Sequence, residues 1–191
     1  MLLCSEILIA IYRFLPLLQN RLYMAKLYIN KDIVADKDKM ENWYLTGEEG
    51  LSFPDIQNFL SWIDPNDHVI DIEIHSCGGD AVEGYAIYDA LRASGKQISC
   101  TAVGRCASMA TVILLAAAKE RRFAYPHAKF LIHKPYMASY DGDLDLETLE
   151  SIKSNLESEK NKMLALYVER TGSEASVIEA QMNKAGWFGG E

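Results

Sequence analysis

The sequence predicts an α/β protein with a mainly parallel sheet, and three observations carry that prediction. Strand-like segments recur along the chain, and the clearest, His68–His75, alternates polar and apolar residues. Helical segments of about ten or more residues, such as Ala81–Ala93, separate these strands. Because a crossover of that length lets the chain re-enter a sheet in the same direction, βαβ units follow. The third observation is the composition, 49% hydrophobic and 24% charged, which is typical of a folded globular chain.

Composition and charge exclude several classes of function. The 191 residues can bury a sizeable core, which argues against disorder. A formal charge of −8 gives no net attraction for nucleic acid or anionic membranes, so we expect neither as a partner. The four cysteines form no CxxC pair and no zinc-type spacing, which favours a reducing, cytoplasmic location. We therefore expect no structural metal and no cofactor.

The chain divides into an extension at residues 1–23 and a single domain at residues 24–191. The extension is rich in Leu and Ile, but Glu6, Arg13 and Pro16 interrupt it. Its uninterrupted apolar runs are therefore too short to span a membrane. It also lacks the positive charge that begins a signal peptide. Met24 has the features of a natural start, so an upstream extension or an incidental amphipathic helix is the plainer interpretation. A helix that docks on another subunit is the alternative.

The elements before the turn at Gly78-Gly79 follow from local signals. Ser52, Pro54 and Asp55 provide a capping residue, a first-turn proline and an acid for the helix dipole, so a helix begins there. The elements expected in order are a strand at Leu27–Val34, a charged loop at Asp36–Asn42, a helix from Ser52 to Trp62 and a half-buried strand at His68–His75.

The second half continues the same alternation and ends in a long helix. The expected elements are a helix at Ala81–Ala93, a strand at Gln97–Val103, an apolar helix at Ser108–Ala118, strands at Arg121–Tyr125 and Lys129–His133, a long helix at Leu144–Arg170 and a short helix at Glu174–Asn183. The long helix has apolar residues every three or four positions and spans about 40 Å at about 1.5 Å per residue. A helix of that length is expected to pack against a neighbouring subunit.

Three strand ends carry residues that suit chemistry. Ser108 opens a helix after a strand, where backbone N–H groups could stabilise an oxyanion. Gly78 and Gly79 form a second strand-to-helix turn that a substrate backbone could approach closely. His133 ends a third strand and could act as a general base. Each also has a plain structural explanation. Ser108 would be a helix N-cap, the two glycines ordinary turn residues, and His133 a structural histidine.

The order of these residues resembles the Clp protease family, namely its proteolytic subunits together with related phage and mobile-element proteases. The resemblance covers Asp67–Glu191 and rests mainly on three blocks. These blocks are Ile74-His-Ser-Cys-Gly-Gly79, Gly104-Arg-Cys-Ala-Ser-Met-Ala110 and Phe130-Leu-Ile-His-Lys-Pro135. The resemblance implies a crotonase-like fold with a βαβ spiral and a long protruding helix.

The same resemblance implies a serine endopeptidase that degrades unfolded polypeptides. By position, Ser108 would be the nucleophile and His133 the base, while the backbone N–H groups of Gly79 and Met109 would form the oxyanion hole. Identical subunits would assemble as rings, a heptamer or a double ring, around a closed chamber. The segment Tyr136–Asp143 would lie near substrate and ring contacts, and an AAA+ unfoldase would supply ATP-driven threading, because this chain has no nucleotide-binding loop.

Three departures from the family pattern leave alternatives open. The family's histidine-orienting aspartate falls at Ala185, so Asn183 or another acid replaces it, or Ser108 and His133 act as a dyad. Cys77 stands where proline is usual, and oxidation with Cys106 could close the site. The chain also stops where the family continues, which is expected of a truncated domain. The alternatives to general proteolysis are a phage-type head-maturation protease, a weak or inactive ring subunit and an acyl-CoA enzyme of the crotonase superfamily.

Overall fold

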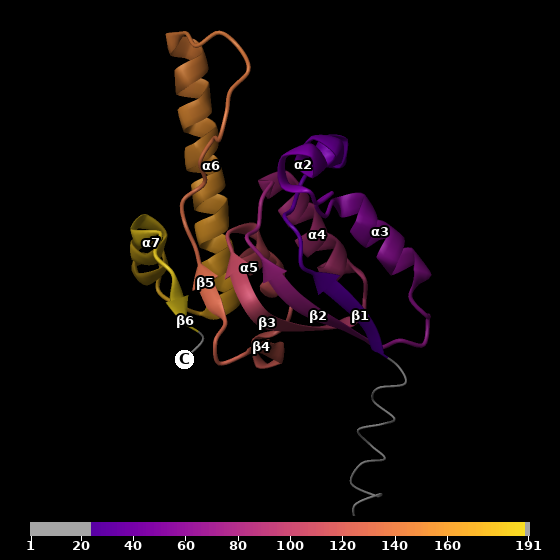
Figure 1. Ribbon diagram of the computed structural model, residues 1–191. Coiled ribbons are helices and arrows are strands. Elements are labelled where there is room, and N and C mark those ends of the chain that lie inside the picture. The colour runs from indigo at the N-terminus through magenta and orange to yellow at the C-terminus, as the bar shows by residue number, and fades with distance from the viewer. Residues whose placement is uncertain (1–23, 190–191) are drawn as a thin grey trace, which may run out of the picture.

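The computed structural model describes residues 24–189, which form a six-stranded sheet, the helices that cover it and one long projecting helix (Figure 1). Residues 1–23 lie outside the described part, so both interpretations of that extension stay predictions. The strands are β1 (Met24–Ile29), β2 (Val69–Ser76), β3 (Gln97–Ala107), β4 (Arg122–Ala124), β5 (Lys129–Leu131) and β6 (Phe188–Gly189). The helices are α2 (Lys39–Thr46), α3 (Phe53–Trp62), α4 (Ala81–Ala93), α5 (Met109–Leu114), α6 (Leu146–Thr171) and α7 (Ala175–Lys184), with short 3₁₀ turns η1 (Asp36–Asp38) and η2 (Lys119–Arg121).

The sheet is mainly parallel, as the sequence predicts. Its strand order is β1-β2-β3-β5-β6, with β4 also paired to β3. All pairs are parallel except β5 with β6. The sequence analysis missed β6 because it is only two residues long; Phe188 stacks on Phe130 there, with ring centroids 5.8 Å apart.

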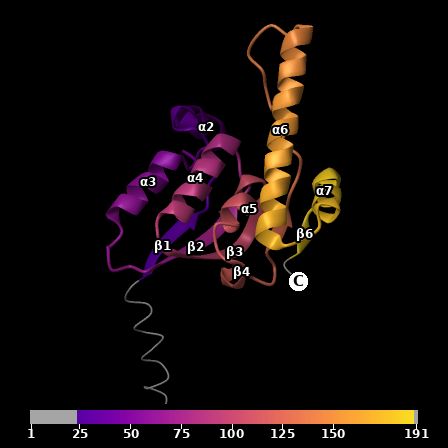
Figure 2. The same ribbon diagram turned by 180° about the vertical axis from the view of Figure 1, so that it is seen from behind.

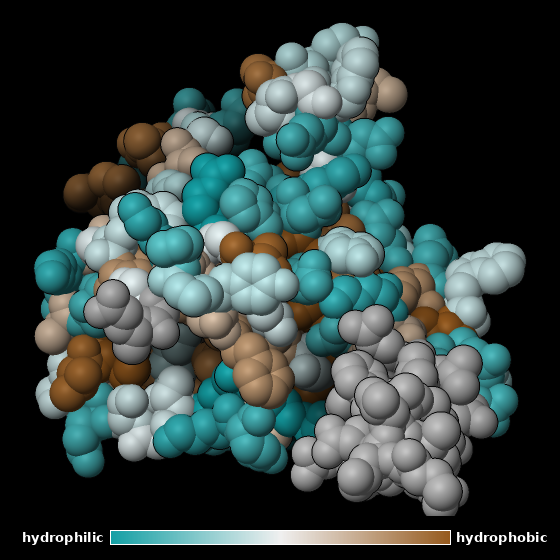
Figure 3. Space-filling view, turned by 60° about the horizontal axis from the view of Figure 1, so that its bottom comes forward, coloured by the Kyte–Doolittle hydropathy of each residue, from teal (hydrophilic) through white to brown (hydrophobic). Residues whose placement is uncertain are grey.

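The two faces of the sheet differ in polarity. Ile70, Ile72 and Ile74 of β2 are fully buried, and helices α2, α3, α4 and α5 lie on one side of the sheet in both ribbon views (Figures 1 and 2). The opposite face carries the alternate residues; Lys26 of β1 pairs there with Asp71 at 2.6 Å and with Glu73 at 2.7 Å. Seen from below, hydrophobic residues form separate small groups among hydrophilic ones (Figure 3). The half-buried strand predicted from alternation is therefore confirmed.

The capping signal at Ser52 works as predicted. The backbone N–H of Ser52 donates to the Asp55 carboxylate at 2.8 Å, and α3 then runs to Trp62. The Glu83 carboxylate of α4 accepts from the N–H of Phe53 at 2.6 Å, which ties the start of α3 to α4. Local capping and a tertiary contact thus fix the same helix end.

The charged loop predicted at Asp36–Asn42 is wrong, because this segment contains η1 and the start of α2. Lys39 at the start of α2 pairs with Asp36 at 3.1 Å and with Asp55 at 2.7 Å. No residue of α2 is buried, so its sequence lacks the apolar stripe from which a helix is predicted.

Two predicted boundaries also shift for identifiable reasons. The strand predicted at Leu27–Val34 ends at Ile29, because Ile33 instead forms isolated bridges with Leu51 and Gly79. The helix predicted at Ser108–Ala118 ends at Leu114. Side chains from outside this helix bind the carbonyls that would continue it: Arg170 donates to Leu115 O at 3.0 Å and to Ala117 O at 2.9 Å.

Helix α6 has a buried half and a projecting half. Met163 and Tyr167 are each 4% exposed, whereas Leu146 is 81% and Leu149 is 48% exposed. Figures 1 and 2 show the N-terminal half standing clear of the sheet, with only the preceding loop beside it. Gly172 ends the helix in a left-handed conformation at φ 75°, as the Thr171-Gly172 signal predicts.

A first prediction concerns the close contact between α4 and α5. A Cβ on Gly84 would lie 2.6 Å from Met109 Cε and 2.9 Å from Met109 Cβ. Alanine is the better helix former by about 1 kcal/mol, but overpacking costs about 1–3 kcal/mol. We expect Gly84→Ala to lower the free energy of unfolding in urea. Gly186→Ala is the control, since the nearest atom would be 3.4 Å from its Cβ; an unchanged Gly84→Ala would contradict the packing.

A second prediction concerns pH. Burial acts to raise the pKa of Asp55, but hydrogen bonds from Lys39 and Ser52 outweigh it and hold that pKa below its ordinary value. A lowered folded-state pKa gives stability that is present above about pH 4 and lost as the pH falls further. We expect the parent to lose more free energy of unfolding between pH 5 and pH 3 than Asp55→Asn does. Asp141→Asn should follow the parent, and equal slopes for all three proteins would refute this role.

Candidate active site

Ser108 lies at the junction between β3 and α5 in an unusual backbone conformation. Its φ is 52° and its ψ is −128°, and Ala185 is the other non-glycine residue with positive φ in the part of the chain that the structure describes. Such a conformation costs about 1–3 kcal/mol and persists only where the surroundings impose it. The Ser108 side chain makes no capping hydrogen bond to α5. The plain N-cap interpretation therefore fails, and the hydroxyl is left for another role.

The glycine turn packs directly against this junction. Gly78 has φ 86°, and a Cβ there would lie 2.6 Å from Ala107 O and 2.7 Å from Met109 N. Gly79 has φ 145°, and a Cβ there would collide with Ile33 O. The Ile33 carbonyl accepts a hydrogen bond from Asp80 N–H, and Ile33 N–H donates to Gly78 O, both at 2.8 Å. Only glycine fits at either position. Close packing therefore explains the two glycines better than an ordinary turn does.

Two amides at this junction have no acceptor. Within residues 24–189, neither the N–H of Gly79 nor that of Met109 donates a hydrogen bond. Both amides lie at this junction, since a Cβ on Gly78, the neighbour of Gly79, would be 2.7 Å from Met109 N at the start of α5. Unpaired amides beside a free hydroxyl provide the donors that an oxyanion requires.

β5 delivers His133 to the same edge of the sheet. Ala107 pairs with Leu131, and the N–H of Ser108 donates to Leu131 O at 2.8 Å. His133 follows Leu131 by two positions, is half-buried, and has its ring 5.4 Å from that of Tyr136. No hydrogen bond joins Ser108 Oγ to the His133 ring in the described part of the chain. The structure thus places the two residues at adjacent strand ends without a direct bond between them.

The second ring nitrogen of His133 is held by a backbone carbonyl. Nδ1 lies 2.6 Å from Lys134 O, and because a carbonyl only accepts, Nδ1 carries the proton. Nε2 then keeps its lone pair and is the nitrogen able to act as a base. No described carboxylate bonds to His133. Ala185 caps α7 in a left-handed conformation, and the exposed Asn183 forms no hydrogen bond to the ring, so neither substitutes for an orienting acid.

The two cysteines of the oxidation hypothesis are close along the backbone, since Ser76 pairs with Cys106 across β2 and β3, but their thiols differ in burial. Cys106 is fully buried and Cys77 is exposed, and both are free thiols. Burial raises the pKa of the Cys106 thiol, which keeps it protonated and slows disulfide exchange. Burial likewise raises the pKa of Cys100 to about 12. Oxidation of Cys77 with Cys106 is therefore a poor candidate for regulation.

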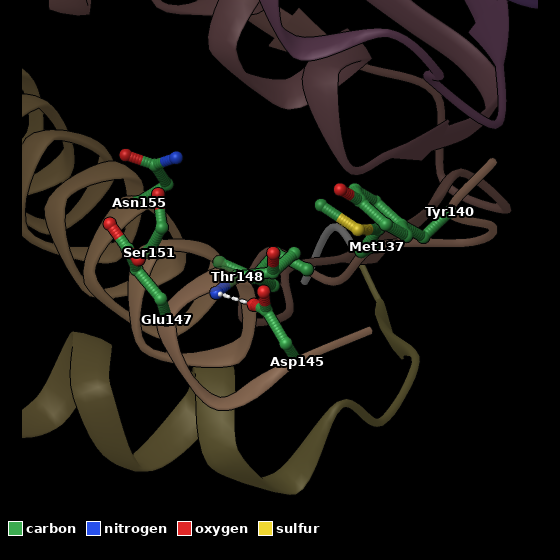
Figure 4. Close-up of a pocket in the computed structure, with 8 residues that line it drawn as sticks. Met137, Tyr140, Asp145, Glu147, Thr148, Ser151 and Asn155 are labelled. Carbon is green, nitrogen blue, oxygen red and sulfur yellow. Dashed lines mark hydrogen bonds between the residues drawn. The ribbon is translucent and has the colours of Figure 1, made fainter. Parts of the chain in front are cut away.

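A pocket of about 400 Å³ lies away from these residues, between the 134–145 loop and the first turns of α6 (Figure 4). Met137 and Tyr140 border it from the loop, and Asp145 caps α6 by accepting from Thr148 N–H at 2.7 Å. None of the predicted site residues lines it. This pocket belongs to the projecting end of the molecule.

The described residues contain no group of three or more His, Cys, Asp or Glu side chains arranged to hold a metal ion. Among the helices of residues 24–189, none is both long and apolar enough to cross a membrane.

A mutant of ClpP1 from Listeria monocytogenes shares the fold, with a TM-score of 0.68, at 20% identity; 93% of this chain and 87% of that chain are covered. The architecture is therefore the α/β fold of Clp protease subunits, as the sequence predicts.

The Clp protease family model matches residues 55–191, so the chain belongs to the Clp protease family. Over 134 residues it is 32% identical to the ATP-dependent Clp protease proteolytic subunit 1 of Chlamydia muridarum, covering 68% of this chain and 67% of that protein. Over 137 residues it is 31% identical to the ATP-dependent Clp protease proteolytic subunit of Porphyromonas gingivalis, covering 70% and 60%. The enzyme class is that of the serine-type endopeptidases, which are hydrolases.

The geometry of the glycine turn makes a prediction about thiol reactivity. We expect a maleimide to modify Cys77 in the native protein within minutes, because its thiol is exposed. Cys100 and Cys106 should react only after denaturation, since both are fully buried. Peptide mass spectrometry would locate the label. Rapid native labelling of Cys106 would contradict the packing of β3 beneath the glycine turn.

Proposed function

We propose that this protein is a proteolytic subunit that hydrolyses peptide bonds of unfolded polypeptides with Ser108 as nucleophile and His133 as base. The observation that carries the proposal is the state of Ser108. Its backbone is held at φ 52°, its hydroxyl is not used for capping, and its neighbours include two amides without acceptors. A strained junction that leaves both a hydroxyl and amide donors free has little use as ordinary structure.

The reaction would proceed by acyl transfer. His133 Nε2 removes the proton as Ser108 Oγ attacks the peptide carbonyl, and the amides of Gly79 and Met109 bind the resulting oxyanion. The protonated imidazole then gives its proton to the leaving amine, which forms the acyl-enzyme. Water, deprotonated by the same imidazole, hydrolyses the ester and regenerates the serine. This sequence requires Nε2 to come within hydrogen-bond reach of Ser108 Oγ while Nδ1 stays on Lys134 O, a tightening common when substrate binds.

The proposed pair is a dyad in which Lys134 O takes the place of a carboxylate. The 2.6 Å contact to Nδ1 selects the correct tautomer. A neutral carbonyl stabilises the imidazolium less than a carboxylate does, and disrupting the carboxylate–histidine unit of a triad costs up to about 10⁴-fold in rate. We therefore expect slow turnover relative to a complete triad.

Assembly and partners follow from the family and from α6. We infer that identical subunits form rings around a chamber, with the exposed apolar residues Leu146 and Leu149 of α6 meeting another subunit. A separate AAA+ unfoldase would thread unfolded substrate into the chamber and hydrolyse ATP. A cytoplasmic location fits free thiols at Cys77, Cys100 and Cys106.

A catalytically weak or silent ring subunit is the second candidate, and the absence of a carboxylate at Ala185 favours it. A head-maturation protease would use the same chemistry on folded scaffold or capsid proteins without an unfoldase. Cleavage of folded scaffold protein in the absence of ATP would favour that version. Cleavage of unfolded casein that depends on an added unfoldase would favour general proteolysis.

The nucleophile assignment is tested with a fluorophosphonate probe. We expect the parent to be labelled at Ser108 and Ser108→Ala to show no labelling, because the probe reacts only with an activated hydroxyl. His133→Gln should lower labelling by at least about 10³-fold, as expected for loss of the base.

Ser61→Ala is the matched control, since Ser61 lies on the exposed surface of α3 and its hydroxyl bonds only to Asn58 O. It should label like the parent. Equal labelling of Ser108→Ala and parent would refute the nucleophile. An unlabelled parent that assembles into rings would favour the silent subunit.

A further inference from the structure

We propose that Thr111 and Tyr167 are positioning residues that aim the Met109 amide at the oxyanion. This inference rests on the proposed peptidase function and adds a specific role for helix α6. Neither residue touches the proposed reacting atoms. Both would act through the peptide that joins Ser108 to Met109.

The contacts form a short chain from α6 to the nucleophile. The Thr111 hydroxyl donates to Ser108 O at 2.6 Å, and Thr111 N–H donates to the same oxygen at 2.9 Å. The Thr111 Oγ1 also lies 2.5 Å from the Tyr167 hydroxyl. Thr111 and Tyr167 are each 4% exposed, so solvent does not compete for these bonds.

The direction of each hydrogen bond follows from which groups can donate and which can only accept. A carbonyl can only accept, so the Thr111 hydroxyl donates its single proton to Ser108 O. The Tyr167 hydroxyl must then donate to Thr111 Oγ1. Burial raises the pKa of Tyr167, which keeps its phenol protonated and able to donate. The chain of bonds therefore has one consistent proton arrangement.

Holding this carbonyl also orients the amide. Ser108 C=O and Met109 N–H belong to one planar trans peptide, in which the two bonds point in opposite directions. With the carbonyl fixed toward Thr111 and Tyr167, the Met109 N–H points away from α6 and finds no acceptor within residues 24–189. Rotation of this peptide would misdirect the donor, and two hydrogen bonds from Thr111, one of them supported by Tyr167, oppose that rotation.

The anchor of this chain lies on the buried half of α6. Arg170, about one turn beyond Tyr167, donates to Leu115 O and Ala117 O at the end of α5. Arg122 reinforces the joint by donating to Arg170 O at 2.7 Å. Figures 1 and 2 both show α5 beside the lower part of α6. The buried end of the projecting helix is thus linked, through Thr111, to the peptide that follows the proposed nucleophile.

The experiment compares Tyr167→Phe and Thr111→Val with the parent. The first keeps the ring and removes the hydroxyl, and the second keeps the side-chain shape. Loss of an oxyanion donor costs about 10²–10³-fold in kcat, so a misdirected donor is expected to lower kcat by about 10–100-fold with KM unchanged. The substrate is a short fluorogenic peptide, which needs no unfoldase. Affinity for a peptide boronate, whose tetrahedral adduct uses the oxyanion hole, should fall by a similar factor.

Two controls separate positioning from folding. Thr111→Ser keeps the hydroxyl and should retain most of the activity, whereas Tyr28→Phe alters an exposed tyrosine of β1 and should match the parent. Should Thr111→Val fail to fold, Tyr167→Phe decides the matter, because it retains the ring.

An active parent with unchanged kcat and boronate affinity in Tyr167→Phe would overturn this inference alone. A higher KM with an unchanged kcat would overturn it as well. A parent that neither cleaves the peptide nor labels at Ser108 would overturn the proposed function, and this inference with it.

Discussion

The backbone of Ser108 depends on pairing between β3 and β5 more than on any local preference. A serine at φ 52° is strained, and the strain is held from both sides of the residue. Leu131 O accepts its N–H, and Thr111 donates twice to its carbonyl. The first bond is part of the sheet and the others come from α5, so the junction exists only where strand and helix are both in place. The same pairing brings His133 to this edge.

The glycine turn adds a second constraint, which works by excluding side chains. Gly78 leaves no room for a Cβ against Ala107 O and Met109 N, and Gly79 leaves none against Ile33 O. Ile33, which the sequence analysis placed inside a strand, is needed instead as a separate brace for this turn. Packing of three distant segments against one another thus sets the spacing between the hydroxyl and the two amides.

The sequence predicted the features that depend on local pattern, and it missed those that depend on tertiary contacts. Helix α4 was predicted with its observed bounds, and the parallel sheet followed from crossover lengths. The end of α5 could not be predicted, because Arg170, far along the chain, binds the carbonyls of Leu115 and Ala117 just beyond it. The role of Lys134 O was equally hidden, since a backbone carbonyl has no sequence signature. Tyr167 falls within the long helix predicted from apolar spacing, and nothing in the sequence indicates that its hydroxyl contacts Thr111.

Among residues 24–189 no carboxylate bonds to His133, so the proposed site must be stabilised by other means. Lys134 O fixes which nitrogen bears the proton, but in the proposed mechanism it would offer no charge to the imidazolium formed during attack. Under that proposal, more of the transition-state stabilisation would have to come from the oxyanion side, where the proposed donors are backbone amides whose direction is set by packing. A site built this way is sensitive to the rigidity of the Ser108–Met109 peptide. The bonds from Thr111 to Ser108 O, supported by Tyr167, supply that rigidity from the helix that also extends out of the subunit.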